Sequence, residues 1–342
     1  MSGANIPVVL LQGTPFERGR QHGVRFRHEI ANATAAARSL HGEAAYEEAR
    51  REAGAAFPAI EARAPDVAAE LQGSAGGSAL DPIDILLRSG FEFFQTAPAS
   101  GCSAVAVATP QGALVAQNWD APPNFAPELV LLLHFGPDGF EQAIIASHGG
   151  LGWVGCNRHG LAFVNNDLMM TSTVPGLPSQ IVRRLILRER SVAAALEQLR
   201  SLPHMAGRSY LLGDASGAVA GVEVAAQAGA RVNQAASPVL HTNHALDPDI
   251  AREESAAMLA ATYPSSRHRY DVLRRKLPAG PDVPAIAALL ADEEGLPDSV
   301  CKVASPAEPS ATLFSVIFEC GARSLLLCPG APAQHSYQRF TW

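Results

Sequence analysis

The sequence predicts an α+β fold in which large antiparallel sheets are covered by helices. The chain up to about residue 94 is rich in Ala, Glu and Arg, a composition that favours helices. The rest of the chain alternates short apolar runs with tight turns, and two predicted helices interrupt these runs near the middle. Strands that are joined by tight turns rather than by long crossovers pair in antiparallel fashion, so the pattern by itself predicts large antiparallel sheets.

A short apolar strand is predicted over residues 6–11, followed by a helix that begins after Thr14. Thr14 can cap this helix, a proline follows it, and Glu17 lies three residues after the cap, so the segment contains a capping box. Gly19 and Gly23 lie four residues apart and therefore on one helical face. Since glycine is costly inside a helix, this spacing indicates that another element packs closely there.

Residues 26–94 are predicted to be mostly helical and to cover one face of a sheet. We expect the helices to be interrupted at three prolines and at one glycine cluster, namely Pro58, Pro65, Pro82 and residues 73–77. Asp81 is expected to cap the helix that leads toward Phe94. The region carries no pattern of catalytic residues, so its predicted task is to hold the segment before Cys102 in place.

Two short apolar runs, over residues 103–108 and 113–118, flank a turn at residues 109–112 and predict a β-hairpin. Cys102 immediately precedes the first strand and follows Gly101, after two further small residues, Ala99 and Ser100. The first position of a strand, just after a glycine, is an unusual place for a cysteine that only fills the core. The segment therefore marks Cys102 as a candidate for chemistry.

The same reading predicts the remaining elements of the chain. Further strands are expected over residues 128–135, 140–147, 151–157, 161–166, 209–214, 218–224, 239–244, 311–319 and 324–328. Further helices are expected over residues 178–190, 191–199, 263–277 and 284–291. Glu223 lies inside an apolar strand, and the pattern leaves open whether it is buried with a partner near the site or points to solvent.

The composition argues against several classes of function. The formal net charge is −7 and only 17% of the residues are charged, which gives no reason to expect nucleic-acid binding. We find no apolar stretch of the ~18 residues that a membrane span needs, and no secretory leader. Five cysteines without a CxxC pair argue against a disulfide framework and favour a reducing, cytoplasmic setting. His241 and His244 lack the flanking acid of a metal motif, so we expect neither a metal nor a cofactor.

Cys102 could act as a nucleophile if the chain were cut before it. The reference pKa values of a thiol, about 8.5, and of an α-amino group, about 7.7–8.0, lie close together. A free amino group on Cys102 could therefore take the proton from its own thiol, whereas an amide nitrogen in the intact chain cannot. The alternative interpretation is a buried cysteine that behaves as a small apolar residue.

Several segments together resemble the isopenicillin N acyltransferase family, also called the acyl-coenzyme A:6-aminopenicillanic acid acyltransferase family, of the N-terminal nucleophile (Ntn) hydrolase superfamily. The resemblance implies a single domain, 1–342, with two stacked antiparallel sheets between two helical layers, the four-layer αββα sandwich. It also implies an inactive zymogen that cuts itself between Gly101 and Cys102 into pieces 1–101 and 102–342. The segments that carry it are residues 13–23, 101–120, 149–166, 207–224, 241–244 and 299–314.

The resemblance also implies roles for three further residues. Asn243, in the sequence His-Thr-Asn, matches the family's donor to the oxyanion, and an amide can donate without bringing a charge into the site. Asp120, which the return strand could bring beside Cys102, matches the carboxylate that assists processing. Lys302 stands where the family has an arginine, which keeps the charge but loses the planar fork. Arg267 and Arg269 are rival sources of that charge, although an exposed helix face is the simpler interpretation for both.

The leading hypothesis from the sequence is a self-processing cysteine amidohydrolase or acyltransferase. Cys102 would attack an amide or thioester bond of a small acylated molecule and form an acyl-enzyme. Its partners would be that substrate and the association of its own two pieces, and the sequence leaves homo-oligomer formation open. The alternatives are an uncleaved thiol esterase and a non-catalytic binding relative whose Cys102 is unreactive.

Overall fold

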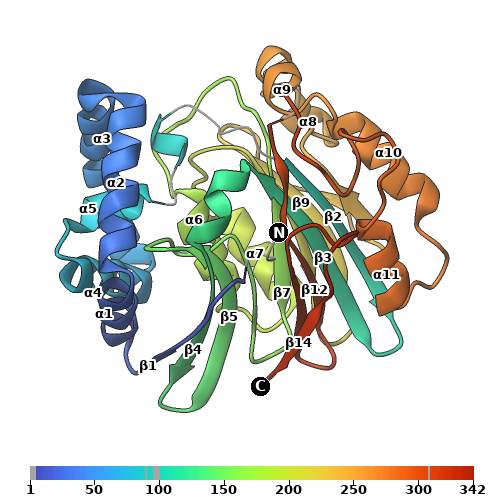
Figure 1. Cartoon of the computed structure of the whole chain (residues 1–342), viewed down its shortest axis with the longest axis horizontal. Helices are drawn as coiled ribbons and strands as arrows, with labels where there is room; N and C mark the ends of the chain where they lie inside the picture. The colour runs from blue at the N-terminus through green and yellow to red at the C-terminus, as the bar shows by residue number, and fades with distance from the viewer. Residues whose placement is uncertain (1–4, 89–90, 95–100, 307–308) are drawn as a thin grey trace.

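Two stacked β-sheets lie between two layers of helices in the computed structural model, which describes residues 5–88, 91–94, 101–306 and 309–342 (Figure 1). The first sheet has eight strands in the order β1-β4-β5-β6-β7-β8-β9-β10, and the second has six in the order β11-β2-β3-β12-β13-β14. Helices from the first part of the chain lie on one side and helices from residue 266 onward lie on the other. The expected αββα arrangement is therefore confirmed.

The first sheet is built mostly from consecutive strands joined by tight turns, as the sequence predicts. Its strands are β1 (Val8–Gln12), β4 (Leu129–Gly136), β5 (Gly139–Ser147), β6 (Val154–Asn157), β7 (Ala162–Asp167), β8 (Arg208–Gly213), β9 (Val219–Ala225) and β10 (Gly229–Gln234). One pair departs from the antiparallel expectation, because β1 runs parallel to β4, with Val8 opposite Leu131. The long segment between these two strands, which contains several helices and the hairpin of the second sheet, acts as the crossover that a parallel pair requires.

The second sheet is antiparallel throughout its described pairs and contains the predicted hairpin at its centre. Its strands are β2 (Gly101–Thr109), β3 (Gly112–Ala121), β11 (Val239–His241), β12 (Ala311–Glu319), β13 (Ser324–Pro329) and β14 (Gln338–Thr341). The prediction missed β10 and β14, which are edge strands. Both are partly exposed and mix polar with apolar residues, so they lack the apolar runs that reveal buried strands.

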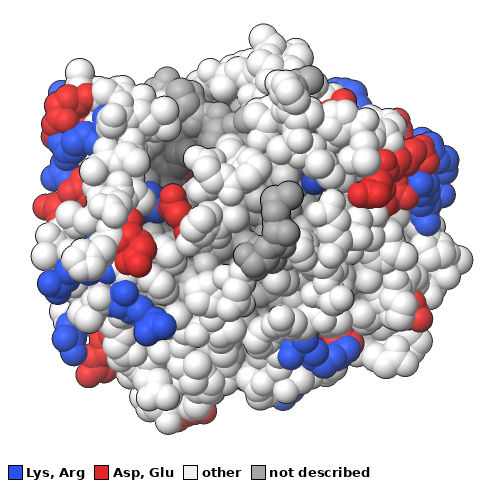
Figure 2. All heavy atoms as spheres, viewed as in Figure 1, with Lys and Arg blue, Asp and Glu red and all other residues white. Residues whose placement is uncertain are grey.

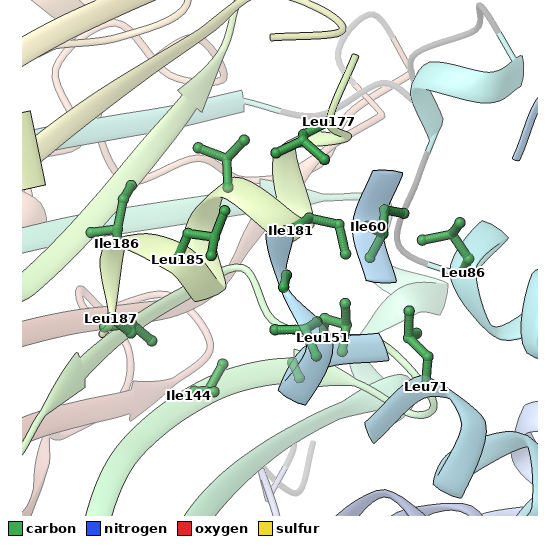
Figure 3. Close-up of a cluster of buried hydrophobic side chains, with 14 of the residues drawn as sticks. Ile60, Leu71, Leu86, Ile144, Leu151, Leu177, Ile181, Leu185, Ile186 and Leu187 are labelled. Atoms are coloured by element: carbon green, nitrogen blue, oxygen red, sulfur yellow. The ribbon is translucent and has the colours of Figure 1, made fainter. Parts of the chain in front are cut away.

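The first helical layer covers the outer face of the first sheet. It contains α1 (Pro15–Arg25), α2 (Arg27–His41), α3 (Glu43–Arg63), α4 (Pro65–Ser78), α5 (Pro82–Leu87), η1 (Phe91–Phe94), α6 (Ser179–Ile186) and α7 (Val192–Ser201). Figure 3 shows how Ile60 of α3, Leu71 of α4 and Ile181 of α6 point into a common apolar interior that also contains Ile144 of β5. The predicted caps Thr14 and Asp81 are confirmed, since both accept a hydrogen bond from a helix N–H, and Ser191 caps α7 in the same way.

Helices α1 and α4 pack with their backbones in direct contact through glycines. A Cβ atom added at Gly19 or Gly23 of α1 would overlap with backbone atoms of α4, and one added at Gly73 or Gly77 of α4 would overlap with backbone atoms of α1. The close packing expected at Gly19 and Gly23 is therefore confirmed. The expected helix break at residues 73–77 is wrong, because these glycines permit the contact while the helix continues.

Pro58 does not interrupt the helix either. It lies inside α3, where Tyr46, Ala53 and Ile60 are buried on one side of the helix. This buried face offsets the hydrogen bond that proline cannot donate. By contrast, Pro65 and Pro82 do begin helices, as expected.

The second helical layer covers the outer face of the second sheet. Helices α10 (Ser266–Lys276) and α11 (Val283–Leu290) pack Val272, Leu273 and Ile286 against apolar side chains of β2 and β3. Two short helices that the sequence did not predict, α8 (Pro248–Ala251) and α9 (Ala256–Thr262), precede them. Among the described residues, no helix is long and apolar enough to cross a membrane.

The inner faces of the two sheets form a separate apolar layer. It includes Ala104 and Val115 from the second sheet, and Val164 and Leu211 from the first. On the face seen in Figure 2, charged side chains of both signs lie mainly toward the edges, over the helical layers. The ends of β3 and β7 and the start of β2 carry polar side chains instead, and the candidate site lies there.

Candidate active site

Cys102 is the second residue of β2 and is almost fully buried, with 5% of its surface exposed. The hairpin register places Gly101 opposite Asp120 and Cys102 opposite Trp119. The return strand therefore brings Asp120 back beside the Gly101–Cys102 bond, as the sequence suggests. Ala99 and Ser100, which precede this bond, lie outside the described residues.

Asn243 reaches Cys102 because β11 pairs with β2, with His241 opposite Ala104. The backbone N–H of Cys102 donates a hydrogen bond to Asn243 Oδ1 at 2.9 Å. The amide nitrogen Nδ2 of Asn243 donates to the backbone carbonyl of Asp167 at 3.3 Å. Ser266, the first residue of α10, holds this segment from the other side, since its Oγ accepts from the backbone N–H of Asn243 at 2.8 Å.

Asp120 and Lys302 both lie on the Gly101 side of the Gly101–Cys102 peptide bond. Asp120 Oδ1 accepts from Thr312 Oγ1 at 2.8 Å, and the same hydroxyl accepts from the backbone N–H of Lys302 at 3.0 Å. Lys302 is buried, and its Nζ lies 3.5 Å from the position that a Cβ atom on Gly101 would occupy. The corresponding distance for Asp120 Oδ2 is 3.0 Å. The structure thus brings all four predicted residues together.

Arg269 lies in the same site, which corrects the expectation of an exposed helix face. It projects from α10 toward the second sheet, is fully buried, and donates from Nη1 to the backbone carbonyl of Cys102 at 2.5 Å. Its Nη2 donates to Asn243 Oδ1 at 2.9 Å. Arg267, two residues earlier, is exposed as expected. No sequence pattern separates these two arginines, because only the rotation of α10 decides which one faces the sheet.

Asp167, the last residue of β7, is a site residue that the sequence reasoning missed. Its carboxylate contacts Arg208 Nε at 3.1 Å and accepts a hydrogen bond from the Tyr263 hydroxyl at 3.2 Å. Arg208 in turn contacts Glu92 at 2.9 Å, and both of these side chains are buried. One signal was available, since Asp167, like Asp120, is the first acid after an apolar strand.

The thiol of Cys102 is held in its protonated form in the intact chain. Burial is the main cause that raises its pKa well above the ordinary value, and the negative charges of Asp167 and Asp120 raise it further. Arg269 and the backbone N–H of Asp120 act in the opposite direction but do not outweigh burial. A thiol in this state is a poor nucleophile until a nearby base takes its proton.

Glu223 and the two histidines support the loop that carries Asn243. Glu223 is buried, accepts from the backbone N–H groups of Leu246 and Asp247 at 2.7 and 2.8 Å, and contacts His241 Nε2 at 2.8 Å. The open question about Glu223 is thereby answered. His244 Nδ1 lies 2.8 Å from Ser266 Oγ, and burial lowers the pKa of His244 to about 4.

Comparison with known proteins identifies the family of this chain. The sequence profile of the acyl-coenzyme A:6-aminopenicillanic acid acyl-transferase family matches residues 107–334. The chain belongs to this family. A curated relative, the 40 kDa form of acyl-coenzyme A:6-aminopenicillanic-acid-acyltransferase from Emericella nidulans, is 29% identical over 338 residues, which cover 95% of this chain and 92% of the relative. Membership in this family supports an enzyme that transfers acyl groups.

Two solved structures show a partial likeness to this acyl-transferase family member. Penicillin V acylase from Agrobacterium tumefaciens is 15% identical with a TM-score of 0.40, covering 67% of this chain and 82% of that chain. A variant of conjugated bile acid hydrolase from Clostridium perfringens is 11% identical with a TM-score of 0.41, covering 70% of this chain and 97% of that chain. Both TM-scores are low, so the αββα architecture is assigned from the sheets and helices of this chain alone.

Proposed function

We propose that this chain is a self-processing cysteine hydrolase or acyltransferase whose nucleophile is Cys102. The observation that carries the proposal is the hydrogen bond of 2.9 Å between the Cys102 N–H and the Asn243 side chain. Cleavage before Cys102 would turn that N–H into a free amino group while its partner stays in place. Base, nucleophile and amide donor would then lie together at the start of one strand.

The proposed reaction uses the freed amino group as the base. It takes the proton from the thiol, and the sulfur attacks the carbonyl carbon of an amide or thioester. Asn243 Nδ2 donates to the oxyanion that forms, in exchange for its long contact with the Asp167 carbonyl. The ammonium returns its proton to the leaving group, which leaves an acyl thioester on Cys102. Water or an amine then attacks this thioester and frees the acyl group.

The substrate class follows from the relatives. The curated relative is named for the transfer of an acyl group from acyl-coenzyme A to 6-aminopenicillanic acid. We infer a small acylated molecule with an amide or thioester bond as the substrate. A cytoplasmic location remains part of the proposal.

The intact mass of freshly purified protein under denaturing conditions tests this function. The whole chain is 35.9 kDa, and the proposal expects two species whose larger member begins with Cys102 by N-terminal sequencing. A Cys102→Ala chain should remain whole and inactive, whereas Cys156→Ala, which alters another buried cysteine outside the site, should still be cleaved. Acyl turnover by the Cys102→Ala chain would contradict the mechanism.

A chain that stays whole would favour one of the two alternatives. Alkylation of Cys102 then separates them, because a thiol esterase needs a reactive cysteine and a binding protein does not. The raised thiol pKa in the intact chain argues against the esterase, since this thiol has no free amino group to activate it.

A further inference from the structure

Arg269 makes a set of contacts that the proposed reaction does not yet use. Its guanidinium donates to the Cys102 carbonyl, to Ser103 Oγ at 3.0 Å and to Asn243 Oδ1, while its Nε donates to Ser265 Oγ at 3.0 Å. The side chain is fully buried, so these contacts are made without competition from bulk water. A planar fork with several donors suits such a set, which the ammonium of a lysine cannot reproduce.

We propose that Arg269 is a positioning residue that orients the Asn243 amide toward the substrate and keeps the freed amino group of Cys102 in its neutral, basic form. This inference rests on the proposed function, because it concerns the amino group that cleavage would create. Arg269 would thus act in two ways, by orienting the amide and by its charge, and a different substitution of Arg269 tests each of them.

The orientation part follows from counting donors at one atom. Two N–H groups, from Cys102 and from Arg269, converge at 2.9 Å on the same side-chain atom of Asn243. Only the oxygen of an amide can accept both, so the nitrogen must point the other way. That direction places two N–H donors away from Arg269, where the oxyanion would form. Without Arg269 the amide loses one of the two hydrogen bonds to its oxygen that hold it in this orientation.

The charge part follows from the position of the guanidinium. The Cys102 nitrogen and Arg269 Nη2 bind the same oxygen, so a cation lies next to the future amino group. A positive charge at this distance disfavours the ammonium form and therefore lowers the pKa of the amine. Burial acts in the same direction.

Other charged groups around Cys102 also act on the amino group. Asp120, in β3 of the second sheet, opposes Arg269, and Lys302, in the segment that precedes β12, assists it. From the first sheet, Asp167 opposes Arg269 too, but Asp167 is already paired with the buried cation Arg208. Arg269 shares a hydrogen-bond acceptor with the amine, whereas Asp167 is paired with Arg208 and Asp120 accepts from Thr312. We therefore expect Arg269 and Lys302 together to outweigh the two carboxylates at the amino group. A neutral amine at physiological pH can accept the thiol proton without first losing one of its own.

The test is a titration of the cleaved protein labelled with [15N]cysteine, in which only one cysteine carries a free amino group. We expect the pKa of this amine in the wild-type protein to lie below the ordinary range of about 7.7–8.0. In Arg269→Gln it should rise by about 1 or more, and the acid limb of the kcat/KM profile should move to higher pH by the same amount. Arg267→Gln, an exposed neighbour on α10, should change neither.

Arg269→Lys separates the two parts. It keeps the charge, so the acid limb should stay in place, but it loses the fork, so kcat should fall about 10- to 100-fold. A wild-type amine pKa at or above about 8 would overturn the charge part, even if Arg269→Gln fails to fold or to be cleaved. Unchanged kcat in Arg269→Lys would overturn the orientation part. An uncleaved wild-type chain has no amine to titrate, and this outcome contradicts the proposed function instead.

Discussion

At the scale of single residues, the candidate site depends on contacts between side chains far apart in the sequence. Cys102 and Asn243 are 141 positions apart and meet through one hydrogen bond. The sequence predicted Cys102 from its place after a glycine at the start of an apolar strand, and it predicted Asn243 from the resemblance of its segment to a family motif. Arg269 could not be chosen in this way, because the rotation of its helix depends on the tertiary structure. Asp167 follows an apolar strand, but the ion pair that places it in the site also depends on the tertiary structure.

The role of Asn243 leads to a prediction on turnover. Replacing Asn243 by Ala removes the amide donor to the oxyanion, so kcat of the cleaved enzyme should fall about 100- to 1,000-fold. Steady-state kinetics on a chromogenic amide would measure the loss. Asn124→Ala, at an exposed position, is the control and should keep its activity. A loss confined to KM would show that Asn243 binds the ground state rather than the oxyanion.

At the scale of elements, the glycines between α1 and α4 set the distance between two helices. Gly73→Ala would push a methyl group into the backbone of α1, so the free energy of unfolding should fall by about 3 kcal/mol. Gly76→Ala, on the exposed side of the same helix, meets no atom within 4 Å and should stabilise the chain by about 0.5–1 kcal/mol. Urea unfolding of both variants in the uncleaved Cys102→Ala background measures the difference. Equal free energies of unfolding for the two variants would contradict the close contact between α1 and α4.

Two buried histidines join helices to the first sheet and make stability depend on pH. Burial lowers the pKa of His22 in α1 to about 4, and it lowers that of His134 in β4 to about 3. His22 Nε2 accepts a hydrogen bond from the Gly149 N–H at 3.1 Å, which requires an unprotonated nitrogen. Between about pH 6.5 and about pH 4, both histidines are therefore protonated in the unfolded chain and neutral in the folded one.

Stability should therefore be complete above about pH 6.5 and decrease as the pH falls through about 4. The expected slope is about 1.4 kcal/mol per pH unit for each histidine, because the unfolded state takes up a proton that the folded state does not. Urea unfolding of the Cys102→Ala chain between these values measures it. His22→Gln should reduce the slope, and His28→Gln, at an exposed position, should leave it unchanged.

The helices and strands were largely predictable wherever burial produces a regular spacing of apolar residues along the sequence. Strands such as β4 and β12 are apolar because both of their faces are covered, and tight turns mark their ends. The errors arose where local propensity opposed packing. Residues 73–77 look like a helix break by composition, yet a neighbouring helix makes glycine the residue that fits.

At the scale of the whole molecule, the two proposed pieces share one apolar interior. Ile60 and Leu71 come from the first piece and pack in the same cluster as Ile144 and Ile181 from the second. The parallel pairing of β1 with β4 also joins the two pieces within one sheet. The sequence order of helices and strands predicted the layers, but the parallel edge strand required a contact between segments about 120 residues apart, which no local pattern reveals.

This shared interior predicts that cleavage does not release the pieces. After processing, native mass spectrometry should give the mass of the whole chain or a multiple of it, while denaturing conditions should give two species. The apolar surface between the pieces would be exposed on separation, which opposes dissociation. Recovery of piece 102–342 alone from a native sizing column would contradict this expectation.

The hairpin register has a consequence for the new chain end. The ladder between β2 and β3 runs from Gly101 opposite Asp120 to Thr109 opposite Gly112. A cut before Cys102 would remove only the outermost pair, Gly101 with Asp120, so the new N-terminus would start within a strand that is still paired. Chain ends are usually frayed and sample many positions. The new N-terminus at Cys102 would have the restricted motion of a residue inside a strand. Its thiol would therefore be oriented before any substrate binds.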